Sequence, residues 1–269
     1  LLALKHINAT SNKDKIEGAH LLYILFRLGL QKTTHINEIE ALFMDKKLKE
    51  IRSWVIEIYP YCEYNTEQDV DQIIKICLSN INEKDPNLSN KSILSYLRFI
   101  YSCRIDLSHR KDEILKYLFY KPEYDYTGVR IKLINRIIMS YSTKNIDTAF
   151  YLFYNLITSD QLKQYNTSKQ NQTRYELHNG CLHICKNINN YNLSKLTNVL
   201  YDTNCRYAYL ILECITYYKD KLAIIKDELE KIKSNENILP CIKDYIHTLN
   251  QSKFKEIKSD KWEELLSYL

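Results

Sequence analysis

Apolar residues recur at three- and four-residue spacing along most of the chain, the pattern of helices that bury one face. The segments 20–26, 54–58 and 93–97 show this spacing most clearly. Breakers are rare, since the 269 residues include only four glycines and four prolines. Few breakers favour long helices over barrels or sandwiches. Turn signals at 85–87, 121–123 and 203–204 separate the helical segments, and Pro86 suits the first turn of one helix. The pattern predicts an all-α protein.

A basic residue recurs at the predicted helix starts, with an apolar or aromatic residue three positions later. Its positions are Arg52, Lys91, Arg130 and Arg206. The first three are 39 residues apart (91 − 52 and 130 − 91), and the fourth follows after 76 (206 − 130), close to two periods. HEAT and armadillo units repeat every 40–47 residues or so, and these helical hairpins stack into a solenoid. We therefore predict a HEAT/armadillo-like helical-hairpin solenoid, with these four residues as structural repeat positions.

The domain organisation follows from the same pattern. We expect residues 1–269 to form a single HEAT-repeat domain, and, because the chain starts at Leu1 instead of Met, to be a fragment of a longer protein. The segment 159–175 is polar and has no apolar stripe, so we expect a loop or insertion between repeats there.

Charge and cysteine usage limit the class of protein. The net charge is +5, from 38 Lys and Arg against 33 Asp and Glu, and the two signs are interspersed, as on a solvated surface. The eight cysteines stand mostly among apolar residues, where reduced core cysteines occur, so we expect a cytosolic or nuclear compartment. No apolar run approaches the roughly 20 residues that span a bilayer, and we expect no membrane partner.

One cluster has the residue types of a metal site. His178, Cys181 and Cys185 share a helix face at i, i+3 and i+7, and zinc accepts thiolate and imidazole ligands. Three residues on one straight helix rarely enclose an ion, however, and no second Cys/His pair stands nearby in sequence. We therefore predict a core or interface stripe and no metal.

Catalytic motifs are not visible. The sequence has no nucleophile elbow, no glycine-rich phosphate loop and no HExxH motif, so we expect no catalytic residues, cofactor or small-molecule substrate. Direct RNA binding is a weak alternative, since aromatic residues near basic ones can stack single-stranded bases. The tyrosines that invite this reading are Tyr207, Tyr209, Tyr217 and Tyr218, but with 23 tyrosines in the chain ordinary packing explains them better.

Four segments, in order, resemble a known family. They are 50–59 (EIRSWVIEIY), 87–101 (NLSNKSILSYLRFIY), 125–134 (DYTGVRIKLI) and 242–249 (IKDYIHTL). Together they resemble the N-terminal HEAT domain of the symplekin family, scaffolds of eukaryotic pre-mRNA 3′-end processing whose yeast counterpart is a cleavage and polyadenylation factor subunit. The order and approximate spacing hold over nearly the whole chain.

The resemblance implies a nuclear, non-catalytic platform. In that family the domain docks and stimulates a phosphatase that acts on serines of the RNA polymerase II C-terminal repeat, and the other expected partners are cleavage and polyadenylation factor subunits. The docking surface would include the helix that starts near Gly128. A basic contact residue of the family aligns with Asn135 here, flanked by Lys132 and Arg136, and we add Lys91 and Arg98 as candidate contacts. The alternative is an unrelated HEAT adaptor, for example in transport or ribosome assembly.

Overall fold

The computed structural model describes residues 11–30, 48–125, 128–164, 170–201 and 207–218, and the isolated positions 221, 224, 227 and 231. Within these ranges all regular structure is helical, which confirms the all-α prediction. The packing divides the chain into two compact units, Leu1–Ile137 and Ile138–Leu269. The division falls inside helix α8 (Val129–Lys144), so each unit is described by itself. The expectation of one domain stays a prediction.

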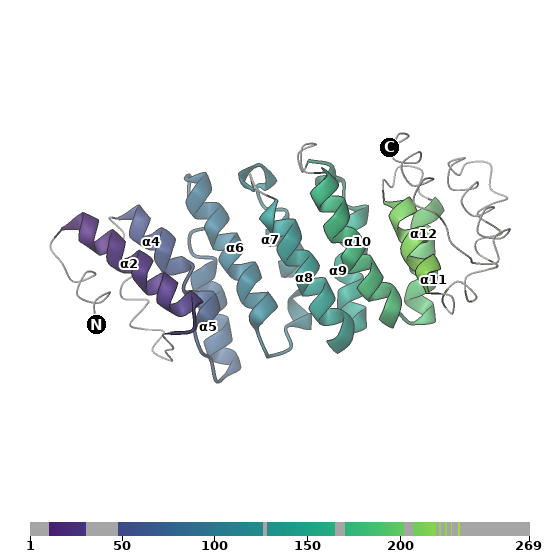
Figure 1. The fold of residues 1–269 in the computed structure, drawn as a ribbon, viewed down its shortest axis with the longest axis horizontal. Coiled ribbons are helices and arrows are strands. Elements are labelled where there is room, and N and C mark those ends of the chain that lie inside the picture. Colours follow the sequence, from purple (N-terminus) through teal and green to yellow (C-terminus); the bar gives the residue numbers. More distant parts are fainter. Residues whose placement is uncertain are drawn as a thin grey trace. The chain divides into compact units, whose positions relative to one another are not determined.

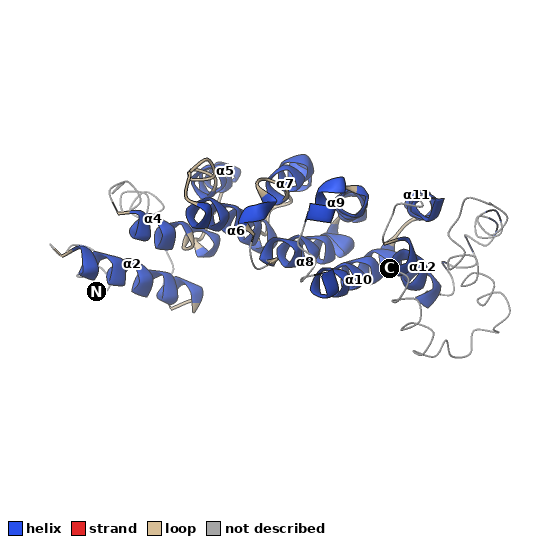
Figure 2. Cartoon of the chain, turned by 90° about the horizontal axis from the view of Figure 1, so that it is seen from above, coloured by secondary structure: helices blue, strands red, loops and turns tan. Residues whose placement is uncertain are grey.

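The first unit contains a row of three helices, each packed on the next. Helix α4 contacts both α2 and α6, and α6 also contacts α5 and α7. Figure 1 shows α2, α4 and α6 following one another, and in Figure 2 α5 and α7 lie on the same side of α6. The helices before α8 are α2 (Asn12–Arg27), α4 (Lys49–Ile56), α5 (Glu67–Cys77), α6 (Pro86–Ser102) and α7 (Lys111–Leu118), with short 3-10 turns η1 (Tyr59–Tyr61), η2 (Ser108–Arg110) and η3 (Pro122–Tyr124).

The second unit also has its helices in two layers. Helix α10 packs on α9 and α12, and α11 packs on the same two helices. Figure 2 shows α9 and α11 on one side of this unit and α10 and α12 on the other. The helices are α9 (Ile146–Thr158), α10 (Gln170–Asn187), α11 (Asn190–Asn198) and α12 (Ala208–Tyr217), with 3-10 turns η4 (Asp160–Gln164) and η6 (Val199–Tyr201).

Local sequence signals set several helix starts. Asp85 caps α6 by accepting a hydrogen bond from the Leu88 N–H at 2.9 Å, and Pro86 is the first helical residue, as predicted. Thr66 and Asp69 form a capping box at the start of α5. Asparagine side chains cap α9 and α11 in the same way. These caps satisfy backbone donors that a helix leaves open at its first turn.

The polar segment 159–175 is more helical than we expected. The 3-10 turn η4 occupies Asp160–Gln164, and α10 begins at Gln170, so residues 170–175 belong to a helix. The expected loop boundary is therefore wrong, because a polar stretch without an apolar stripe can still form the first turns of a helix whose later turns are buried. Residues 165–169 lie outside the described part of the chain.

The turn before α8 has the form that its glycine and proline indicate. Pro122 opens the 3-10 turn η3, and Lys121 before it adopts a left-handed conformation with φ 44°. Gly128 has φ 67°, a conformation that costs glycine little, and α8 begins at the next residue. The turn signal at 121–123 and the helix start near Gly128 are therefore both present in the structure.

Candidate partner-binding surface

Arg130, the third repeat position, is completely buried. Its Nε donates to Asn90 Oδ1 of α6 at 2.8 Å, and its Nη1 donates to the carbonyl oxygens of Leu118 at 3.3 Å and Tyr120 at 2.5 Å. A buried guanidinium is tolerated only when acceptors surround it, as they do here. Arg130 thus joins the start of α8 to α6 and to the turn after α7. These contacts give it a structural role within the first unit.

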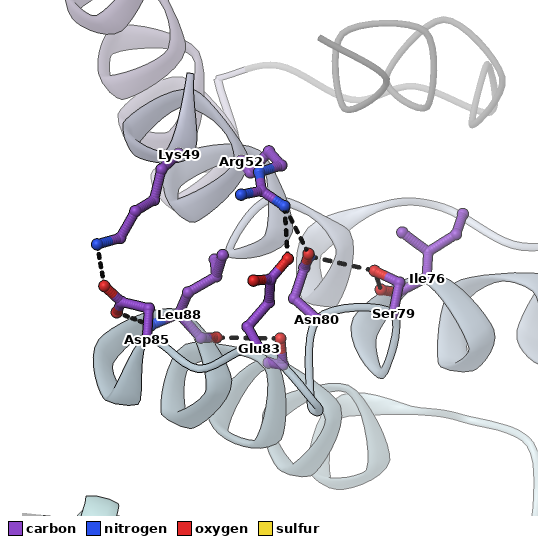
Figure 3. A network of polar contacts seen from close by, with 9 residues as sticks. Lys49, Arg52, Ile76, Ser79, Asn80, Glu83, Asp85 and Leu88 are labelled. Atoms are coloured by element: carbon purple, nitrogen blue, oxygen red, sulfur yellow. Dashed lines mark hydrogen bonds and ion pairs between the residues drawn. The ribbon is translucent and has the colours of Figure 1, made fainter. Parts of the chain in front are cut away.

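Arg52, the first repeat position, reaches in the opposite direction along the chain. Its Nη1 contacts Glu83 Oε1 at 2.7 Å and Asn80 Oδ1 at 3.4 Å, both between α5 and α6. Lys49, one turn earlier on α4, pairs with Asp85, the cap of α6. Figure 3 shows these side chains converging on the α5–α6 turn. The network fixes the start of α6 against α4.

Lys91, the second repeat position, lies nearer the surface than Arg130. Its Nζ is 3.5 Å from Glu57 Oε1 and 4.2 Å from the centroid of the Trp54 ring. Arg98, two turns further along α6, approaches the same Glu57 oxygen at 4.0 Å. Both cationic side chains keep part of their surface in water, at 27% and 29% exposure, whereas the Glu57 side chain is 10% exposed. The fourth repeat position, Arg206, lies outside the described residues.

An aromatic cluster that the sequence analysis did not identify adjoins these cations. The His20 ring stacks on Trp54 with centroids 4.1 Å apart, and Tyr23 tilts against the same indole at 5.5 Å. Tyr61 lies 6.4 Å from Tyr23. Arg27, at the end of α2, donates to the Tyr23 hydroxyl at 3.3 Å. Cations and aromatic rings from α2, α4, η1 and α6 thus share one surface of the first unit.

The expected contact trio on α8 is only partly accessible. Asn135 is 1% exposed, so its placement on a partner surface is corrected: it lies four residues after Ile131 and three before Ile138, on the buried stripe. Lys132 is half-buried and Arg136 is exposed, and at i and i+4 they share the opposite face of the helix. Lys132 and Arg136 remain candidate contacts.

The predicted cysteine stripe lies inside the second unit. Cys181 and Cys185 of α10 are fully buried with their sulfurs 3.9 Å apart, and Cys214 of α12 is fully buried beside them. In the described part of the chain no group of three or more His, Cys, Asp or Glu side chains is arranged to hold a metal ion. All six described cysteines are buried free thiols, and burial raises the pKa of Cys62 to about 12. Cys205 and Cys241 lie outside the described residues.

His178 is the polar member of this cluster. Its Nε2 is 3.4 Å from Glu213 Oε2, and its carbonyl is 3.7 Å from Cys214 Sγ. A side-chain hydrogen bond with Cys214, first, and one in which the Glu213 carboxylate accepts raise the pKa of His178 to about 10. The pKa of Cys214 is lowered, mainly by its hydrogen bond with Cys181 and then by His178. The imidazole therefore carries a charge at neutral pH and joins α10 to α12.

Two of the tyrosines considered for RNA stacking, Tyr217 and Tyr218, form an edge-on pair. Tyr217 is exposed and its ring meets Tyr218 edge-on at 5.2 Å, while Tyr207 is half-buried. An edge-on pair does not present two parallel faces to successive bases. The side chain of Tyr209 lies outside the described part.

No helix among the described residues has both the length and the apolar character that crossing a membrane requires. A scan against models of known protein families and searches of curated proteins and of solved structures found nothing that matches this chain.

Proposed function

We propose that the chain is a non-catalytic helical-repeat scaffold of the HEAT type that binds protein partners. One observation carries the proposal: alternate helices α2, α4, α6, α8, α10 and α12 begin at residues 12, 49, 86, 129, 170 and 208, so successive starts are 37 to 43 residues apart. A regular period of this size with helical hairpins is typical of HEAT repeats. At the three described repeat positions, Arg52, Lys91 and Arg130 contact residues of a neighbouring helix or turn, as in arrays where each repeat contacts its neighbours.

The resemblance to symplekin domains supports a more specific role. We propose that the scaffold works in nuclear pre-mRNA 3′-end processing and docks an RNA polymerase II C-terminal-domain phosphatase, alongside cleavage and polyadenylation factor subunits. Lys132 and Arg136, on the exposed side of α8, are the proposed contacts. Binding to a rigid surface would stabilise the active conformation of the phosphatase without supplying a catalytic group.

A capture experiment with the cognate phosphatase tests this role. The purified chain is immobilised, and bound phosphatase is compared for the wild type and a Lys132→Ala/Arg136→Ala variant, with Asn135 left unchanged because it is buried. The matched control is Lys75→Ala/Lys186→Ala, which removes two exposed charges from α5 and α10. We expect the α8 variant to capture less phosphatase and the control to match the wild type.

The outcomes separate the two levels of the proposal. Equal capture by all three proteins would reject α8 as the docking site. No capture by the wild type would reject the phosphatase role and favour a different HEAT adaptor. Affinity purification from the source organism then identifies the partners, because cleavage and polyadenylation factors are expected only for the symplekin-like role.

A further inference from the structure

Three neighbouring helices of the first unit build a basic surface that the α8 contacts do not include. We define the α2–α4–α6 surface by His20, Arg27, Trp54, Tyr61, Lys91 and Arg98, which belong to α2, α4, η1 and α6. Helix α4 packs against both other helices, and η1 also packs on α6, so these residues are held by one continuous packing arrangement (Figure 1). Rigid elements position side chains better than loops do.

The charge of this surface is positive. Arg27 is exposed, and the side chains of Lys91 and Arg98 are about a quarter exposed. The one acid between them, Glu57, is nearly buried and faces two cations, Lys91 at 3.5 Å and Arg98 at 4.0 Å. Arg98 Nη1 is beyond hydrogen-bond distance of that carboxylate and is itself buried. The Arg98 side chain as a whole is 29% exposed, so its positive charge still reaches the surface.

The charges of both arginines act on one phenol, Tyr61. Burial, first, and the neighbouring Tyr23 raise the pKa of Tyr61, whereas the charges of Arg98 and Arg27 lower it. Arg27 Nη1 donates to the Tyr23 hydroxyl at 3.3 Å, and the Tyr23 ring lies 6.4 Å from the Tyr61 ring. Arginine side chains that reach the surface suit carboxylate groups, which accept paired N–H donors.

The aromatic residues of this surface are already occupied. The His20 ring is stacked on Trp54 at 4.1 Å, and Lys91 Nζ lies over the same indole at 4.2 Å. The indole therefore already has one ring and one cation against it. Here the aromatic rings hold cations in place, whereas a single-stranded RNA site needs open rings on which bases stack.

We propose that the α2–α4–α6 surface binds an acidic peptide segment of a protein partner, rich in Asp and Glu, through Arg27, Arg98 and Lys91. Carboxylates of the segment bind Arg27 and Arg98, and Lys91 contributes a fixed positive charge from its position over Trp54. This surface is separate from Lys132 and Arg136, and its binding does not depend on a phosphatase. A failure of acidic-peptide binding would not bear on the docking role of α8, and a failure of phosphatase docking would not bear on acidic-peptide binding.

Fluorescence anisotropy with a defined probe tests the proposal. The probe is a fluorescein-labelled peptide that alternates glutamate with serine, and the same peptide with glutamine in place of glutamate is the control ligand. We expect the wild type to bind only the acidic peptide, with an affinity that falls as salt is raised. Arg27→Gln/Arg98→Gln should weaken binding by at least about tenfold, since a charge-assisted hydrogen bond contributes that much. Lys75→Gln/Lys186→Gln should bind as the wild type.

Three results would overturn the proposal. They are no binding of the acidic peptide by the wild type, equal binding by the Arg27→Gln/Arg98→Gln variant, and tighter binding of an oligouridine that is lost in that same variant. The last result would assign the surface to RNA. Circular dichroism establishes that each variant is folded. Arg27→Gln alone, at an exposed position, provides a second variant if the double substitution perturbs the fold.

Discussion

Removal of the buried guanidinium at residue 130 should destabilise the first unit strongly. In Arg130→Ala, Asn90 Oδ1 and the carbonyls of Leu118 and Tyr120 lose their donor, and the space of the arginine stem is left unfilled. Each hydrogen bond to a charged group contributes about 1.5–3 kcal/mol, and breaking a buried charged network typically costs about 3–5 kcal/mol. We expect a loss of about 3–5 kcal/mol, a large part of the roughly 5–15 kcal/mol typical of a domain.

Two further substitutions separate packing from hydrogen bonding at this site. Arg130→Met retains most of the volume and should cost somewhat less than alanine, because only the donors are lost. Arg130→Lys retains the positive charge, but a single ammonium group lacks the planar fork that lets the guanidinium reach all three acceptors. The stability of this variant should lie between that of Arg130→Met and that of the wild type. Arg136→Ala, six positions along the same helix and exposed, is the control and should change the free energy of unfolding by less than about 0.5 kcal/mol.

Urea unfolding measured by tryptophan fluorescence provides the assay. Trp54 lies in the same unit as Arg130, and a Trp262→Phe background makes it the only indole of the chain. A double-mutant cycle with Asn90→Ala isolates the Arg130–Asn90 bond, for which we expect a coupling energy of about 1–2 kcal/mol. An Arg130→Ala protein within about 1 kcal/mol of the wild type, or a methionine variant as stable as arginine, would show that the bonds seen at Arg130 contribute little.

Three other predictions concern the start of α5 and the α10–α12 contact. Thr66→Ala should cost about 1 kcal/mol in urea melts, since it removes the capping box of α5. Two backbone N–H groups lower the pKa of Asp69 below its ordinary value of 3.8. The Asp69 carboxylate therefore stabilises the fold fully above pH 3.8, and this effect is lost as the pH falls through the lower folded-state pKa. The difference in unfolding free energy between the wild type and Asp69→Asn should shrink in acid and be unchanged between about pH 6 and 8. Cys214 and Glu213 raise the pKa of His178 to about 10. The protonated imidazole therefore contributes its full stabilisation of the fold below the ordinary pKa of 6.5, and this stabilisation is lost only as the pH rises towards 10. Ring nitrogen NMR shifts at pH 8 should show a protonated His178 in the wild type and a less protonated one in Glu213→Gln; a neutral ring in the wild type would refute this.

The fold class could be predicted from the sequence because its signals are local. Apolar spacing, scarce breakers and the start at Pro86 each depend on a few adjacent residues, and the structure confirms helices there. The predicted period depends on the same kind of local signal: Arg52 and Arg130 stand in the first turns of α4 and α8, whereas Lys91 stands in the second turn of α6. The boundary of the 159–175 segment was wrong because helix formation in residues 170–175 depends on packing further along α10, which local polarity does not report.

The candidate site was harder to predict because its contacts join residues far apart in sequence. Trp54 meets Lys91 and His20 across separate helices, and no spacing rule within one helix reveals that pairing. The burial of Asn135, by contrast, was open to prediction, since it continues the apolar stripe through Ile131 and Ile138. The resemblance to the family pattern predicted Asn135 on the surface, whereas helical periodicity predicts it in the core. The structure has Asn135 in the core.

The three described repeat positions show why a recurring residue need not have a recurring role. Arg130 uses its donors on buried acceptors within the fold, and Arg52 is committed to the α5–α6 turn. Lys91 occupies the same position in the predicted repeat but lies beside the surface, where Trp54 and Glu57 hold it next to Arg98. From their spacing in the sequence alone, all three residues are predicted to have a structural role. Only the surroundings of each side chain separate the residues that stabilise the hairpins from Lys91, whose charge remains available to an acidic partner.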